Sequence, residues 1–245
     1  MIETGSIETG LTETGEPRAR LIRHAQASWG SADYDCLSPL GETQARHLGE
    51  WLAKDLTASY AQVIRGSMRR HAQTLVAIEA AFAAAGRPLP ATRIDPDWNE
   101  FDHEPVLRAY AAANPHDPSL ALARAGEVPA QRALLIAAVQ AWRAGALDGV
   151  EESWEMFGRR IAQARARVLG AADGTVLVVT SGGAMWRCAQ AALGLDEDAL
   201  SRTDLAIHNT GISEFGCTVE PWRMLSWNKL PHLAGPEHQA IVSHY

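Results

Sequence analysis

The strongest strand pattern of the chain lies at residues 175–180, which read Thr-Val-Leu-Val-Val-Thr. An uninterrupted run of apolar and β-branched residues is typical of a central strand of a parallel sheet, because helices cover both of its faces. Ser181, Gly182 and Gly183 follow immediately and turn the chain into a helical pattern. Since parallel strands are joined by crossover connections that are usually helices, this segment indicates a chain of alternating strands and helices.

The remaining strand and helix patterns alternate in the same way. We expect further strands at 19–23, 61–65, 92–94, 213–219 and 222–227. Residues 92–94 should form an edge strand, and residues 222–227 an antiparallel edge strand. We expect amphipathic helices at 38–54, around 75–82, around 135–142, at 153–169 and after 183. This alternation predicts a three-layer α/β/α sandwich with a mostly parallel central sheet.

The length of 245 residues suits one sizeable α/β domain. We expect a single domain over residues 18–245, in which residues 101–149 lack strand patterns and form a helical cap or insertion. Residues 1–17 carry the triplet Glu-Thr-Gly three times at a spacing of five. Repeats this short cannot stack into a repeat fold, so they predict a flexible polar leader.

Composition excludes several classes of protein. A formal net charge of −7 argues against general binding of nucleic acid, which needs a basic face, and no apolar run approaches the length that crosses a membrane. Cys36, Cys188 and Cys217 are odd in number and far apart, which favours reduced thiols and a cytoplasmic location over a disulfide framework. Eight tryptophans leave room for an apolar contact between copies of the chain, so a homo-oligomer is a further option.

Polar residues gather at the predicted carboxyl edge of the sheet, where open parallel sheets bind their ligands. Three strands deliver them: the first brings Arg23 and His24, the second Arg65, Ser67, Arg69, Arg70 and His71, and the strongest Ser181, Gly182 and Gly183. Two of these strands lead into helix N-termini, whose N–H groups favour a bound dianion. Glu100 adds a carboxyl group that can protonate a leaving oxygen. An imidazole nucleophile, guanidinium groups and an acid together predict chemistry on a phosphate group.

Five segments, in order, resemble the histidine phosphatases of the phosphoglycerate mutase-like superfamily. Residues 21–25, Leu-Ile-Arg-His-Ala, are similar to the family's Arg-His-Gly signature, 37–45 to the helix start that follows it, and 66–74 to its Ser-x-x-x-Arg-Ala-x-Gln-Thr block. Residues 98–100, Trp-Asn-Glu, are similar to the stretch that carries the acid, and Asn228 with 231–233 to the closing Asn-x-x-x-His-Leu block. The resemblance extends from Arg20 to Leu233, nearly the whole chain after the leader.

The resemblance implies roles for four residues. His24 is the expected nucleophile and becomes a phosphohistidine, Arg23 and Arg70 hold the phosphoryl oxygens, and Glu100 protonates the departing oxygen and then activates water. It also implies a small phosphorylated substrate and a reaction without a cofactor. The acidic residues around position 100 fit no standard set of metal ligands, so we expect no metal. For Arg65 two options stay open, a phosphate contact or an ion pair at the strand end.

Two positions depart from the family pattern. Ala25 replaces a glycine and adds a methyl group that we expect to narrow the phosphate pocket. Ser181 replaces a second histidine that donates to the phosphoryl group, and a neutral hydrogen bond is about half as strong as a charge-assisted one. We therefore expect slower catalysis, with Ser181 and the backbone of Gly182 as phosphate contacts. His208 and His103 are alternative donors from neighbouring loops.

Other functions compete with a phosphomonoester hydrolase. The departures at 25 and 181 are compatible with a binding or regulatory protein that takes a phosphorylated ligand and has weak or lost catalysis. Ser181 as a hydrolase nucleophile at a strand-to-helix turn is disfavoured, because Val179 stands where that turn needs glycine. A mutase is disfavoured because Trp29 is followed by Gly30, where the family's mutases have a Trp-Asn pair.

Overall fold

The computed structural model describes residues 16–28, 35–57, 59–168, 174–196, 199 and 207–244. The repeated Glu-Thr-Gly triplets and the Trp29-Gly30 pair lie outside the described residues. Within the described ranges, none of the helices combines the length and the apolar character needed to cross a membrane.

A six-stranded sheet forms the middle of the molecule, in the order β3-β2-β4-β1-β5-β6. The strands are β1 (Arg18–Arg23), β2 (Tyr60–Arg65), β3 (Thr92–Ile94), β4 (Thr175–Thr180), β5 (Ile212–Gly216) and β6 (Arg223–Lys229). β4 pairs in parallel with both β2 and β1, whereas β5 and β6 are antiparallel. The structure thus confirms a central parallel strand at 175–180, an edge strand at 92–94 and an antiparallel edge near the C-terminus.

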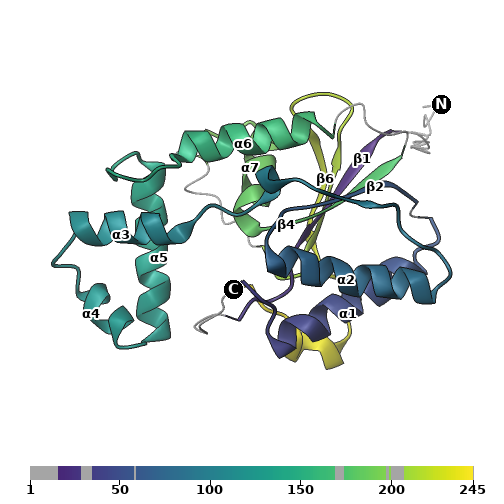
Figure 1. Cartoon of the computed structure of the whole chain (residues 1–245), viewed down its shortest axis with the longest axis horizontal. Coiled ribbons are helices and arrows are strands. Elements are labelled where there is room, and N and C mark those ends of the chain that lie inside the picture. The colour runs from purple at the N-terminus through teal and green to yellow at the C-terminus, as the bar shows by residue number, and fades with distance from the viewer. Residues whose placement is uncertain are drawn as a thin grey trace, which may run out of the picture.

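Helices cover both faces of this sheet (Figure 1), as the predicted three-layer sandwich requires. α1 (Pro39–Lys54) and α2 (Arg69–Ala84) lie on one face, and α6 (Trp154–Ala166) and α7 (Gly182–Leu193) on the other. Successive strand residues point to opposite faces, so each strand contributes to two cores. Leu177 and Val179 pack in the cluster that contains α1 and α2 residues, and Val176 and Val178 in the cluster with α6 and α7 residues.

The start of α1 shows how local sequence positions a loop of the site. Ser38 is the N-cap, and its hydroxyl accepts a hydrogen bond from the Gly41 N–H at 3.0 Å. Pro39 follows in the first turn, where its missing N–H costs nothing. A Cβ atom at position 41 would lie 2.1 Å from the carbonyl oxygen of Gln26. Glycine at 41 therefore lets the segment after β1 lie directly on the helix.

A group of helices stands beside the sheet rather than on it, at the left of Figure 1. It comprises α3 (His103–Ala113), α4 (Pro118–Arg124) and α5 (Val128–Arg143), whereas the sequence pattern predicted one helix in this region, now α5. The side chains of Asp102 and Asp117 cap α3 and α4. These two helices bury little beyond Val106 and Leu120, and the sequence pattern did not predict them. We refer to α3, α4 and α5 as the cap, and the division into one domain with a cap stays a prediction.

Candidate active site

His24 lies directly beyond the end of β1 and is held there by β4. Its backbone N–H donates to the Thr180 carbonyl at 2.8 Å. Its side-chain Nδ1 lies 2.7 Å from the carbonyl oxygen of Ala25, which can only accept, so Nδ1 carries the proton. The lone pair is therefore on Nε2, where the Arg70 Nε–H donates at 3.2 Å. The side chain is only 4% exposed, and the arrangement leaves one nitrogen aimed at the guanidinium.

The charge state of His24 suits a nucleophile. Burial, followed by the positive charges of Arg70 and Arg23, holds the pKa of its imidazole well below the usual value. The ring is therefore neutral at neutral pH, and the Nε2 lone pair is available to attack phosphorus.

Ala25 is fully buried beside the start of α1. It packs in a small apolar cluster with Leu37 and Ala45, and its backbone N–H donates to Thr74 Oγ1 at 3.0 Å. The methyl group thus packs toward α1, and Ala25 is not among the residues that line the described cavities. The expectation of a narrowed phosphate pocket finds no support in this placement.

Arg70 comes from the first turn of α2 and is fixed from the other side by Asp35. Its Nη1 lies 2.7 Å from Asp35 Oδ1, and the Arg69 N–H donates to Asp35 Oδ2 at 2.8 Å. Met68 occupies the N-cap of α2 and has no side-chain oxygen, so the Asp35 carboxylate supplies an acceptor for the helix N-terminus. Sequence reasoning missed Asp35, because an aspartate in a loop that is far from α2 in the chain gives no spacing signal.

Arg23 is the last residue of β1 and points into a cavity. Its Nη1 donates to the carbonyl oxygen of Ile207. A Cβ atom at position 182 would be 3.6 Å from Arg23 Nε, so the guanidinium passes closely over the start of α7. Arg23 and Gly182, two of the predicted phosphate contacts, both line the cavity described below.

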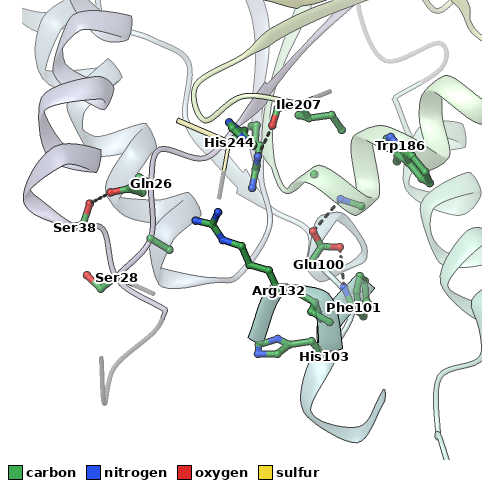
Figure 2. Close-up of a pocket in the computed structure, with 15 residues that line it drawn as sticks. Gln26, Ser28, Ser38, Glu100, Phe101, His103, Arg132, Trp186, Ile207 and His244 are labelled. Atoms are coloured by element: carbon green, nitrogen blue, oxygen red, sulfur yellow. Dashed lines mark hydrogen bonds between the residues drawn. The ribbon is translucent and has the colours of Figure 1, made fainter. Parts of the chain in front are cut away.

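Glu100 reaches the same place from the other edge of the sheet. It follows a 3-10 turn, η1 (Pro96–Trp98), which is tied down by a 2.5 Å hydrogen bond from Thr180 Oγ1 to the Trp98 carbonyl. Its Oε2 accepts from the Gly183 N–H at 2.9 Å in the first turn of α7. A Cβ atom at position 183 would lie 2.1 Å from Glu100 Oε1, so only glycine permits this contact. Glu100 thus lines the same cavity as Arg23, and Figure 2 shows its carboxyl group beside Phe101.

Ser181 is completely buried at the end of β4, and its Oγ lies 2.6 Å from His71 Nε2. His71 is also completely buried, and its ring centroid is 5.6 Å from that of His24. Burial, with Arg70 and Arg65 nearby, holds the pKa of His71 well below its usual value. The sequence placed His71 in the first turn of the second helix but gave it no role, because its partner is 110 residues away.

The other candidate residues lie farther from this centre. Arg65 Nη1 donates to the Gly66 carbonyl at 2.9 Å, and Arg65 does not line the described cavity. His208 Nδ1 lies 2.7 Å from Asn228 Nδ2, and its ring makes a T-shaped contact with the ring of His244. His103 lines the cavity from the start of α3. The histidine nearest to Ser181 is therefore His71 rather than either of the two that the sequence suggested.

A cavity of about 740 Å³ opens above Arg23, Glu100 and Gly182. Its far wall comes from the cap, and Figure 2 shows the Arg132 side chain of α5 extending into it. Apolar side chains form much of the remaining lining: Phe101, Leu135, Trp186 and Ile207. Glu100 also lines an adjoining pocket of about 490 Å³, together with Arg70, whereas His24 and Ser181 line neither of the two. Across the described ranges, no three His, Cys, Asp or Glu side chains converge as a metal site would require.

Comparison with known proteins identifies the family. The family model of the histidine phosphatase superfamily (branch 1) matches residues 19–230. No curated protein sequence matches the chain. Among solved structures, the chain is similar to mycobacterial hydrolase 2, with 18% identity and a TM-score of 0.63 over 93% of this chain and 97% of that one.

Two further structures share the fold. One is a phosphoserine phosphatase of Entamoeba histolytica in complex with 3-phosphoglyceric acid, with 16% identity, a TM-score of 0.58, and coverage of 89% of this chain and 99% of that one. The other is a mycobacterial glucosyl-3-phosphoglycerate phosphatase, with 20% identity, a TM-score of 0.57, and coverage of 86% and 98%. The match of the family model extends over most of the chain, and so this protein belongs to the histidine phosphatase superfamily.

Proposed function

We propose that this protein is a phosphomonoester hydrolase that works through a phosphohistidine at His24. One observation carries the proposal: His24 presents a deprotonated Nε2 to the guanidinium of Arg70 at 3.2 Å, while Nδ1 is held by a backbone carbonyl. A fixed tautomer with its free lone pair beside a phosphate-binding group is the arrangement that nucleophilic attack on phosphorus needs.

In the first step, His24 Nε2 attacks the phosphorus atom and the bond from phosphorus to the ester oxygen breaks. Glu100 in its protonated form transfers its proton to that oxygen, so the alcohol leaves neutral. Arg70 and Arg23 hold the phosphoryl oxygens, on which negative charge is spread during transfer. The Arg70 Nε–H that now donates to His24 must turn to a phosphoryl oxygen as the N–P bond forms.

In the second step, water attacks the phosphorus atom of the phosphohistidine. Glu100, now a carboxylate, accepts a proton from the water, the N–P bond breaks, and the electron pair returns to His24 Nε2. Inorganic phosphate leaves and both side chains regain their starting protonation. The Gly183 N–H that holds Glu100 keeps the carboxyl group in place through both steps.

The cavity supports a small phosphorylated substrate whose leaving group is partly apolar and carries a second anionic group. Phe101, Leu135 and Trp186 offer apolar contacts, and Arg132 brings a positive charge to the wall opposite the phosphate site. The compounds named with two structures of the Entamoeba histolytica phosphoserine phosphatase, 3-phosphoglyceric acid and phosphoserine, both carry a carboxylate as well as the phosphate. Buried free thiols at Cys188 and Cys217 support a reducing compartment such as the cytoplasm.

The test is release of inorganic phosphate from p-nitrophenyl phosphate and from a panel of phosphorylated carboxylic acids. We expect turnover by the wild-type protein and its loss in His24→Ala. An acid-labile phosphoryl group should be trapped on the wild-type chain and mapped to residue 24. Phosphate release that persists in His24→Ala would overturn the mechanism.

A second candidate function is a binding protein for phosphorylated ligands without turnover. The observation that favours it is the 4% exposure of His24, since Arg70 covers the attacking nitrogen. Saturable binding of orthovanadate without phosphate release from any substrate of the panel would establish this alternative. Turnover that depends on His24 would dismiss it.

A further inference from the structure

Ser181 and His24 occupy matching positions on neighbouring strands. β1 and β4 run in parallel, and Arg23 is the partner of Thr180 in their register. His24 and Ser181 are the next residue of each strand, so both emerge side by side at the carboxyl edge of the sheet. The His24 ring centroid lies 5.6 Å from that of His71, whose Nε2 lies 2.6 Å from Ser181 Oγ, so His71 links the hydroxyl to the surroundings of His24.

The Ser181 hydroxyl does not cap a helix, although capping is the usual role of a serine at the start of one. Ser181 is the N-cap of α7, yet its side chain makes no capping hydrogen bond to that helix. The hydroxyl turns instead to His71, with Oγ 2.6 Å from Nε2. Because both residues are completely buried, this contact is protected from water and is stronger than it would be at the surface.

The His71 ring can occupy this place only because Gly66 has no side chain. A Cβ atom at position 66 would lie 2.3 Å from His71 Nδ1 and 2.8 Å from Cε1. Nδ1 is buried and, among the described residues, makes no hydrogen bond, so Nε2 is the nitrogen through which the ring acts. The glycine that ends β2 and the first turn of α2 thus direct one imidazole nitrogen at Ser181.

We infer that His71 is a positioning residue that works through Ser181 in the proposed phosphoryl transfer. His71 Nε2–H donates to Ser181 Oγ, and this fixes the hydroxyl so that its own hydrogen is donated to a phosphoryl oxygen. The inference rests on the proposed function of His24. It explains how Ser181 can stand where the family has a second histidine. An imidazole from α2 orients and polarises the neutral hydroxyl.

The chemistry of the site supports a neutral His71 in this role. Burial and the charges of Arg70 and Arg65 disfavour the imidazolium, so the ring keeps a single N–H. An unpartnered buried N–H is rarer in proteins than an unpartnered acceptor, so we place that N–H on Nε2 and the lone pair on Nδ1. The same pair of residues could be taken for a nucleophilic serine and its base, but Nδ1 has no carboxylate to orient it in the described structure. Ser181 also has an ordinary extended backbone, with φ −115° and ψ 168°.

The test compares five variants with p-nitrophenyl phosphate as substrate: His71→Leu, His71→Gln, Ser181→Ala, the double variant His71→Leu/Ser181→Ala, and His116→Ala. We expect His71→Leu to lower kcat about 10- to 100-fold with little change in KM, by comparison with loss of one transition-state donor. Gln places an N–H near Nε2 and should recover most of that loss. The double variant should be no slower than Ser181→Ala, because the two side chains act as one unit. His116 is exposed in the cap, and its loss should change nothing.

Contrary outcomes are distinct from failure of the proposed function. If His24→Ala abolishes turnover but His71→Leu is as fast as wild type, or the losses at 71 and 181 multiply, the inference is overturned and the phosphatase stands. Labelling of Ser181 by a fluorophosphonate probe would overturn it too, since the serine would then be a nucleophile. If the wild-type protein turns over no substrate, orthovanadate binding replaces kcat. Equal, non-additive weakening by the changes at 71 and 181 supports the inference, and unchanged binding refutes it.

Discussion

The carboxyl edge of the sheet and the cap differ in how deeply they bury the side chains of the candidate site. At the edge, His24 and Arg70 are 4% exposed and Ser181 and His71 are completely buried, each with a hydrogen bond of 3.2 Å or less. From the cap, Arg132, Leu135 and His103 are only partly buried. Groups that must hold a transition state gain from rigid, dry surroundings, whereas groups that select a leaving group need only touch it.

From this contrast we expect chemistry and substrate choice to reside in separate parts of the chain. Substitutions at the sheet edge should lower the turnover of every substrate to a similar degree, because the same phosphoryl transfer takes place with each of them. Changes in the cap should discriminate between substrates and leave the simplest one untouched. Glu100 lies at the junction, since it precedes α3 in the chain but its carboxyl group is held by α7.

Glu100→Gln should produce the largest effect after loss of His24. Glutamine keeps a carbonyl oxygen for the Gly183 N–H but cannot give up a proton. We expect an alkyl phosphate to lose about 10²- to 10⁴-fold in kcat, the range of general acid catalysis. p-Nitrophenyl phosphate should lose less, because its leaving group departs as a stable anion. An equal loss for both substrates, measured by phosphate release, would show that Glu100 is not the acid.

The free energy of unfolding should depend on pH through His232, which lies in the 3-10 turn η2 (Pro231–Leu233) after β6. This histidine is buried against Thr210 Oγ1 at 2.8 Å, and burial lowers its pKa from 6.5 to about 4. Between these values the unfolded chain binds a proton that the folded chain does not, so stability falls as pH falls from 6.5 toward 4. One such group contributes roughly 1.4 kcal/mol per pH unit. In urea unfolding, His232→Gln should lose less free energy of unfolding between pH 7 and pH 5 than wild type does. The same dependence on pH in both proteins would contradict the assignment.

Much of the fold and of the site was predictable from sequence. The run at 175–180 predicted the central strand, and the polar residues after each strand predicted that Arg23, His24 and Arg70 lie at one edge, whereas the choice of Glu100 among its acidic neighbours rested on the family resemblance. These signals are local: each is a motif next to the element that carries it. Asp35 and the pairing of His71 with Ser181 were not predictable, because the contact joins segments that only the folded sheet brings together.

Asp35→Ala should have a smaller effect, which falls on every substrate. Without the carboxylate, Arg70 loses its 2.7 Å partner and α2 loses the acceptor for the Arg69 N–H. A less well oriented guanidinium should lower kcat about tenfold for alkyl and aryl phosphates equally. Glu50→Ala removes an exposed carboxylate of α1 and should match wild type in the same assay. A fall in kcat for only one class of substrate would show that Asp35, like the cap, acts in substrate selection.

Arg132→Met should give the smallest and most selective effect, and it is the sharpest test of the separation. Methionine keeps the length and apolar stem of the side chain but removes the charge that α5 brings to the cavity. For substrates with a carboxylate we expect KM to rise about tenfold, which corresponds to one charged hydrogen bond of about 1.4 kcal/mol or more. p-Nitrophenyl phosphate has no second anion, so its KM should stay the same. Arg124→Met, at the end of α4 and outside the cavity lining, is the matched control. If Arg132→Met weakened both substrates equally, the cap would take part in phosphate binding itself, and the division between an edge for chemistry and a cap for choice would fail.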